Sequence, residues 1–323
     1  MKAIRCNTLG LPRALALEEL PSQPLGERDV RVKIHACSVN FPDTLIIQGL
    51  YQYKPDLPFT PGTDIAGEVT EVGIAVKHYK VGDRVFGAIQ TGGFAEETVA
   101  NAKMVFPIPP GMDYIIGSSF MMAYGTSYHA LKQRARIKEG ETLVVLGASG
   151  GVGLAAVELG KLMGAKVIAC ASTDEKLALC KEYGADETIN YTQEDLKKRI
   201  KELTDGSGAD VVYDAVGGDN AEKALRALAW KGRFLVVGFV AGIPSIPLNL
   251  PLLKGCEIVG VFWGSHIARE PEIHQQNMME LLGYYQTGKL NPHVSKTYSL
   301  EDVPQALTDM MNREVKGKVV IVP

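Results

Sequence analysis

Hydrophobic and polar positions alternate along the first third of the chain. Segments 30–37 (VRVKIHAC) and 65–72 (IAGEVTEV) both alternate in this way, and Gly, Pro and Asp turns separate the short apolar runs up to about residue 108. A period of two is typical of strands with one buried face. The pattern therefore predicts a compact β domain.

From about residue 122 the pattern changes to continuous apolar runs that alternate with helix-like stretches. Parallel strands that are buried on both faces read as such runs, and the intervening helices carry the crossovers. The pattern predicts a doubly wound parallel sheet of the α/β class. The expected strands lie at 142–148, 166–172, 210–216, 233–239 and 257–262, and the clearest helices at 151–164, 174–184 and 194–204.

The last part of the chain returns to strand-like segments. A helix-like stretch runs from about residue 265 to 286, and segments 294–300 (VSKTYSL) and 316–323 (KGKVVIVP) follow it. We expect these strands to pair with the N-terminal β domain. The predicted domains are therefore 1–122 with 266–323, and 123–265.

Composition and charge indicate which kind of partner this chain binds. The 323 residues are 46% hydrophobic and 22% charged, with a formal net charge of -3. Proteins that hold nucleic acid or anionic membranes normally cluster Lys and Arg, so we expect neither partner. A small molecule fits better.

The five cysteines are scattered without a CxxC pair. This spacing disfavours both a disulfide framework and a four-cysteine zinc lobe. We interpret them as reduced thiols of a cytoplasmic protein, because no export signal or membrane-spanning apolar stretch is evident.

A glycine-rich turn at 147–153 (GASGGVG) carries the strongest chemical signal. It lies between an expected strand and an expected helix, and that context gives a glycine motif its specificity. Glycines allow the backbone to approach a pyrophosphate, whose charge then lies at the helix N-terminus. We expect Gly150, Gly151 and Val152 to bind a dinucleotide, the alternative being a glycine-rich turn without a ligand.

The end of the next strand indicates which dinucleotide. An NAD-binding fold carries Asp or Glu there for the ribose hydroxyls, whereas this chain has Ala171, Ser172 and Thr173. The missing carboxylate leaves room for a 2′-phosphate. Asp174 and Glu175 follow, and they are also explained as helix N-terminal residues favoured by the dipole.

Taken together, four motifs give the chain a resemblance to the medium-chain dehydrogenase/reductase superfamily over nearly its whole length. They are 38–51 (SVNFPDTLIIQGLY), 61–69 (PGTDIAGEV), 147–153 (GASGGVG) and 236–242 (VVGFVAG). The resemblance implies a GroES-like β domain plus a Rossmann domain, with the cofactor NADPH bound in the cleft between them. It also implies a homodimer.

The zinc ligands of the superfamily's alcohol dehydrogenases are missing from this chain. Asn40 and Thr63 correspond to a Cys and a His, and Asp64 to a Glu. Amide and hydroxyl groups do not replace thiolate and imidazole as zinc ligands. With its Ser-Val-Asn segment, the chain resembles the zinc-free quinone oxidoreductases and related enone and enoyl reductases, so we expect no metal.

The acceptor site follows from this resemblance. Asn40 is expected beside the nicotinamide and the acceptor, and Tyr51 to donate to a developing oxygen charge. Asp43 is either part of this catalytic site or a cap on the helix that follows it. Asn40 and Tyr51 also have ordinary explanations as turn and packing residues.

Further cofactor contacts are expected from several elements. Lys176, Tyr191 and Arg313 join Ser172 around the 2′-phosphate, Tyr191 and Arg313 by resemblance. The alternatives are a helix cap for Ser172, solvated charges for Lys176 and Arg313, and a packing role for Tyr191. Thr126 resembles the family's residue near the carboxamide. The last group lies at the ends of late strands, where a doubly wound sheet places its ligand crevice: Phe239, Val240, Phe262 and Gly264. The alternative, strongest for Phe262, is that the aromatic residues belong to the core.

The expected function is hydride transfer from NADPH to a quinone or an α,β-unsaturated carbonyl compound. One alternative is an enoyl-thioester reductase, which needs a basic pocket for CoA phosphates. The clearest basic run, 197–201 (KKRIK), has the pattern of a solvated helix face. The other alternative is an NADPH-binding protein with negligible turnover.

Overall fold

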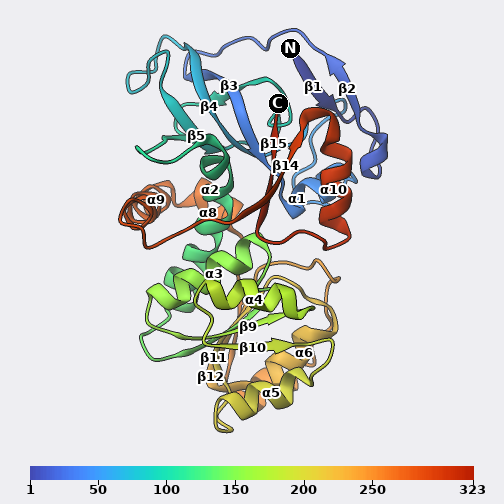
Figure 1. The fold of residues 1–323 in the computed structure, drawn as a ribbon, viewed down its shortest axis with the longest axis vertical. Coiled ribbons are helices and arrows are strands. Elements are labelled where there is room, and N and C mark those ends of the chain that lie inside the picture. The colour runs from blue at the N-terminus through green and yellow to red at the C-terminus, as the bar shows by residue number, and fades with distance from the viewer. The chain divides into compact units, whose positions relative to one another are not determined.

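The structure of this chain, a computed structural model, describes residues 1–323. The chain forms two compact units (Figure 1), the first comprising Met1–Met122 with Pro292–Pro323 and the second Ala123–Asn291. The helices are α1 Phe41–Ile46, α2 Tyr114–Tyr128, α3 Gly151–Leu162, α4 Asp174–Glu182, α5 Leu196–Leu203, α6 Gly218–Arg226, α7 Asn249–Lys254, α8 Trp263–Arg269, α9 Pro271–Gln286 and α10 Val303–Met311.

The first unit is built on a seven-stranded sheet in the order β14-β15-β3-β4-β5-β7, with β6 also paired to β3. A separate pair, β1 and β2, completes its strands. Their bounds are β1 Lys2–Arg5, β2 Ala16–Glu19, β3 Asp29–Ser38, β4 Asp64–Val72, β5 Arg84–Ala88, β6 Glu97–Asn101, β7 Val105–Pro107, β14 Val294–Ser299 and β15 Lys318–Val322.

Strand β3 shows why the predicted β domain forms. Its side chains alternate between buried and less buried positions, so Val30, Val32 and Ile34 enter the core. The predicted return of the C-terminal strands is confirmed: β15 pairs antiparallel with β3 and parallel with β14. Figure 1 shows these late strands, in red, beside the blue β3.

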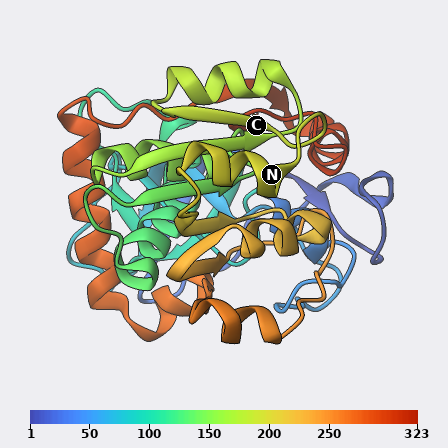
Figure 2. The same cartoon turned by 90° about the horizontal axis from the view of Figure 1, so that it is seen from below.

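The second unit contains a six-stranded parallel sheet in the order β10-β9-β8-β11-β12-β13. In Figure 2, α4 (yellow-green) and α6 (gold) lie on opposite sides of these strands. The predicted doubly wound α/β sheet is thus confirmed. The strands are β8 Thr142–Leu146, β9 Lys166–Ala171, β10 Glu187–Asn190, β11 Ala209–Asp214, β12 Leu228–Val236 and β13 Glu257–Gly260.

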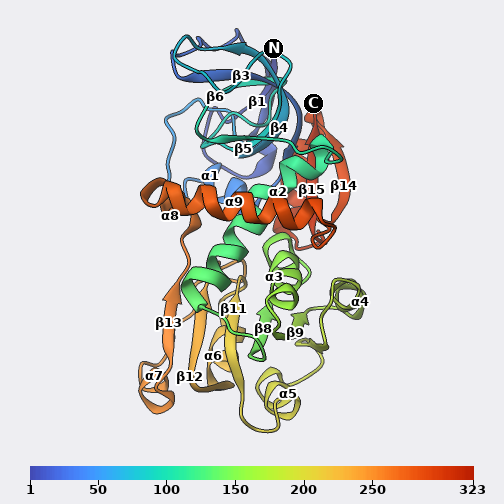
Figure 3. The ribbon, with the colours of Figure 1, turned by 90° about the vertical axis from the view of Figure 1, so that its left-hand side faces the viewer.

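The second division between the units lies further along the chain than the predicted boundary after residue 265. The expected long helix is two helices, α8 and α9 (Figure 3), since Pro271 begins a new helix after Glu270. Helix α9 belongs to the second unit because its side chains engage that unit. Asn277 bonds to Gln133, and His274 packs edge-on against Trp263.

None of the helices combines the length and the apolar composition needed to cross a bilayer.

Candidate active site

The glycine-rich turn of the second unit has the predicted geometry. Gly150 is the N-cap of α3, and no side chain caps this helix end. A Cβ on Gly153 would lie 2.2 Å from the carbonyl oxygen of Gly147, so a larger residue cannot replace it without moving the turn. The first N–H groups of α3, from Gly151 and Val152 onward, therefore suit a phosphate group.

Two buried polar side chains, Ser127 and Tyr213, support the glycine-rich turn. The Ser127 hydroxyl donates to the Val152 carbonyl at 2.7 Å, and it lies 3.0 Å from the Tyr213 hydroxyl. Both side chains are fully buried. Neither residue is recognisable in the sequence as part of a site, because Ser127 lies in a helical segment and Tyr213 in an apolar run.

Of the four residues expected around a 2′-phosphate, two directly follow the neighbouring strands β9 and β10, and Lys176 lies in the first turn of α4. Ser172 follows β9, and the Lys176 ammonium lies 3.4 Å from its hydroxyl. Tyr191 follows β10, and its backbone N–H donates to Ala171. The cap of α4 is Thr173, whose hydroxyl accepts from the backbone of Lys176, so Ser172 is not used as the cap.

The late-strand residues are more exposed than ordinary core residues. Phe239 is 39% exposed and Phe262 53% exposed, which removes the explanation of Phe262 as a core aromatic. Val240 is half-buried, and Gly264 is exposed near the start of α8. Thr126 is buried within α2. Their contact with a cofactor stays a prediction.

In the first unit, the expected acceptor residue Asn40 lies in a buried polar cluster. It caps α1, and its backbone N–H donates to the Asp43 carboxylate at 2.8 Å. Thr63 donates to the other oxygen of Asp43 at 3.4 Å. The capping explanation of Asp43 is therefore visible in the structure, and its catalytic role stays a prediction.

Asp64 and Lys318 complete this cluster. Lys318, the first residue of β15, donates to the Asn40 Oδ1 atom at 2.5 Å and to the Val39 carbonyl at 3.2 Å. Its ammonium lies 4.0 Å from Asp64 Oδ2, to which Ser38 also donates. Lys318 is not recognisable in the sequence as a site residue, because a lysine at the start of an apolar strand looks like a solvated end residue.

Burial sets the ionisation of this cluster. Desolvation raises the pKa of Asp43 from 3.8 to about 7 and that of Asp64 to about 6, and the nearby Lys318 charge opposes both shifts. Desolvation also lowers the pKa of Lys318, against the two carboxylates. Asp64 Oδ1 makes no hydrogen bond of normal geometry, although the Met122 backbone favours its ionised form.

A pH-dependent stability follows from Asp43. Its folded pKa lies above its ordinary value, so its stabilising effect is present at low pH and lost as the pH rises through about 7. Asp43→Asn removes this loss. From pH 5 to pH 8, the free energy of unfolding of the variant minus that of the parent should rise by about 2–3 kcal/mol. Urea unfolding at both pH values measures it.

The exposed residue Asp56 supplies the matched control. Asp56→Asn should follow the parent at both pH values. Parallel profiles for Asp43→Asn and the parent would show that Asp43 carries no proton at neutral pH.

Tyr51 and Arg313 belong to the same unit as Asn40. Tyr51 is half-buried against the core, and its pKa is raised by burial and by the Asp43 charge. Arg313 is exposed in the turn after α10, with a left-handed backbone (φ 62°). Their reach toward a cofactor or an acceptor stays a prediction.

The residues at the zinc-ligand positions do not fit a zinc ion. Asn40 presents its amide oxygen to an ammonium, and Thr63 offers a hydroxyl, so neither supplies the thiolate or imidazole that zinc prefers. The Lys318 charge beside Asp64 would also repel a divalent cation. We therefore assign no chemical step to a metal.

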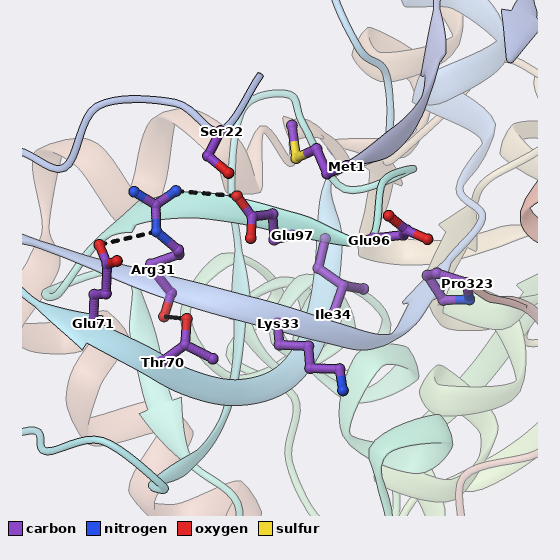
Figure 4. A pocket seen from close by; sticks show the side chains of 10 residues that line it. All are labelled: Met1, Ser22, Arg31, Lys33, Ile34, Thr70, Glu71, Glu96, Glu97 and Pro323. Carbon is purple, nitrogen blue, oxygen red and sulfur yellow. Dashed lines mark hydrogen bonds and ion pairs between the residues drawn. The ribbon is translucent and has the colours of Figure 1, made fainter. Parts of the chain in front are cut away.

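A hollow of the first unit, about 620 Å³ in volume, shares none of these residues. Figure 4 shows Arg31 at its wall, bonded to Glu71 and Glu97. Arg31 is largely buried between these two carboxylates. Arg31, Glu71 and Glu97 thus pair with one another, and we do not take this hollow as the candidate site.

The comparisons with known proteins agree with both units. Residues 26–110 match the alcohol dehydrogenase GroES-like domain, and residues 151–282 match the family described as zinc-binding dehydrogenase. The quinone oxidoreductase-like protein 2 homolog of Nematostella vectensis is 43% identical over 99% of this chain and 88% of its own. The chain belongs to the quinone oxidoreductase branch of the medium-chain dehydrogenase/reductase superfamily.

Other members of this oxidoreductase family show the same match. The human quinone oxidoreductase is 34% identical over 99% of this chain and 97% of its own. The crystal structure of Escherichia coli quinone oxidoreductase complexed with NADPH covers 100% of both chains, with 30% identity and a TM-score of 0.95. The predicted GroES-like and Rossmann units are thereby confirmed.

Proposed function

We propose that this chain is an NADPH-dependent oxidoreductase that reduces a quinone or an α,β-unsaturated carbonyl compound without a metal. The glycine turn at α3 carries the proposal, together with Ser172 after β9 and Lys176 in the first turn of α4. These residues suit a dinucleotide with a 2′-phosphate, and the Escherichia coli relative was crystallised with NADPH. When bound, that cofactor supplies the hydride.

The chain itself supplies binding and electrostatic stabilisation. The N–H groups of α3 would hold the pyrophosphate, and Ser172 and Lys176 would contact the 2′-phosphate. Asn40 and Tyr51 donate hydrogen bonds to the acceptor oxygen as negative charge develops on it. Such donors suffice for electron-poor acceptors, which need less polarisation than a simple ketone.

A panel of acceptors tests the proposal. NADPH oxidation is followed with 1,4-benzoquinone, 2-cyclohexenone and crotonyl-CoA, and we expect turnover with the quinone or the enone. Turnover with crotonyl-CoA alone would establish the thioester reductase instead. NADPH binding without turnover on any of the three would establish a binding protein.

Three cations of the clearest basic run already have partners, which does not favour the thioester. In the 197–201 run, Lys198 pairs with Glu202 of the same helix and Arg199 with Glu194 and Glu202. Lys201 donates to the carbonyls of the following turn. These cations are engaged with their own helix and its surroundings.

Metal removal gives a separate prediction. The protein as purified should contain no stoichiometric zinc, and its turnover should be unchanged in a chelator, because Asn40 and Thr63 stand where ligands would be. Elemental analysis and assays with and without chelator measure this. About one zinc per chain, with activity lost on chelation, would overturn it.

We further propose a homodimer formed through the second unit. Strand β13 is an edge of its sheet, and Ile258 on it is 43% exposed. Nearby in sequence, Ile243, Leu248 and Leu252 are about four-fifths exposed, at 83%, 82% and 78%. A second copy would cover this apolar edge. Sedimentation of a monomer at micromolar concentration would overturn the assembly.

We also propose the cytoplasm as the location of this chain. All five cysteines are free, and four of them are buried. Free thiols in this number suit a reducing compartment. Cell fractionation tests the assignment.

A further inference from the structure

Lys318 is a buried cation for which the proposed reaction has so far no role. It is only 6% exposed and belongs to β15, whereas the carboxylates around it belong to α1 and β4. Burying an ammonium is costly unless it is paired and hydrogen-bonded. Its position among these groups, far from it in sequence, therefore needs an explanation.

The strongest contact of this ammonium is with an amide and not with a carboxylate. It is 2.5 Å from Asn40 Oδ1 and 4.0 Å from Asp64 Oδ2. An amide has one oxygen and one nitrogen, and a cation can bond only to the oxygen. Lys318 therefore determines which way the Asn40 side chain faces.

The other end of that amide is held only weakly. Asn40 Nδ2 lies 3.4 Å from the Ser38 carbonyl, 3.5 Å from Thr63 Oγ1 and 3.4 Å from Asp64 Oδ2. All three distances exceed the usual range for an N–H donor. The N–H groups of Asn40 are thus available to a better acceptor.

We propose that Lys318 is a positioning residue of the active site, which holds the Asn40 amide with its N–H groups directed to the acceptor oxygen. The inference rests on the proposed function of Asn40 as a donor. The ammonium also supplies fixed positive charge next to this donor. Hydrogen bonding to a cation makes the amide N–H a stronger donor.

A merely structural role predicts something different. In that case Lys318 only neutralises Asp64 and Asp43, and any change that restores the charge balance restores activity. The double variant Lys318→Met/Asp64→Asn removes one positive and one negative charge, so it separates the two roles. If Lys318→Met alone does not fold, the double variant can still be assayed.

The experiment compares the parent, Lys318→Met, the double variant and the control Lys103→Met, which changes an exposed lysine of the same unit. Turnover, KM for 1,4-benzoquinone, NADPH dissociation constant and Tm are measured for each. We expect Lys318→Met to lower kcat by about tenfold or more, with the NADPH constant nearly unchanged. The double variant should recover Tm and still turn over slowly.

Two outcomes would overturn the inference. One is recovery of kcat together with Tm in the double variant, and the other is a parent-like kcat in Lys318→Met. If the parent itself reduces no acceptor, the proposed function fails, and the inference is decided by the side-chain amide NMR signal of Asn40. A shift in Lys318→Met relative to Lys103→Met then supports the positioning role, and an unchanged signal rejects it.

Discussion

Asn40→Ala should lower turnover by roughly 100- to 1,000-fold, the loss that follows removal of one donor to a developing oxyanion. Tyr51→Phe should lower it by roughly 100-fold, as expected for loss of a proton-donating group. Both groups act on charge that forms during hydride transfer, so the effect belongs in kcat and not in cofactor binding. Stopped-flow reduction of the best acceptor and a cofactor titration measure the two quantities.

The neighbouring Tyr53 supplies the control, because it is 37% exposed and lacks the contact of Tyr51 with the core. Tyr53→Phe should keep parental turnover. If Asn40→Ala and Tyr51→Phe do so as well, these residues only pack and cap, and the acceptor site lies elsewhere.

Preference for NADPH over NADH should depend on Lys176. Its ammonium lies beside the Ser172 hydroxyl at the end of β9, where both can contact a 2′-phosphate. A charge-assisted hydrogen bond contributes about 1.5–3 kcal/mol, so Lys176→Ala should lower kcat/KM for NADPH on the order of tenfold or more. NADH, which has no such phosphate, should be used almost as before.

Ser172→Asp should act in the same direction by placing a carboxylate against the phosphate. The control is Lys181→Ala. Lys181 lies on α4, as Lys176 does, but its ammonium donates to the Asp186 carbonyl. Equal use of both cofactors by the parent would refute the assignment. So would equal losses for the two cofactors in Lys176→Ala.

The fold was predictable from sequence where periodicity and glycine geometry are strong. The apolar runs gave five of the parallel strands, and the turn at Gly147–Gly153 gave the first crossover. Segment 187–190, which forms β10, has only four residues and no long apolar run, so its pattern alone did not mark it. The break at Glu270 was missed because a proline suits the first turn of a helix as well as a helix end.

The candidate site was predictable only in part. Asn40, Asp43 and Tyr51 lie in one motif, and a single contiguous motif can be recognised. The capping contact of Asp43 was one of two explanations that only coordinates could separate. Lys318 is far from that motif in sequence, and its role depends on β15 pairing with β3, a long-range event without a local signal.

The position of β15 has a consequence for how the protein is made. The second unit is one uninterrupted stretch of chain, so a ribosome can deliver it whole and let it fold during translation. The first unit cannot complete its sheet until the end of translation, because β15, which bonds to Cys37 and Ser38, is translated after all of Ala123–Asn291. Until then the Cys37–Ser38 end of β3 is an unpaired edge, and Asn40 has no ammonium beside it. A circular permutant that starts at Pro292 would reverse this order, giving the nascent chain its complete first sheet before the nucleotide-binding unit emerges.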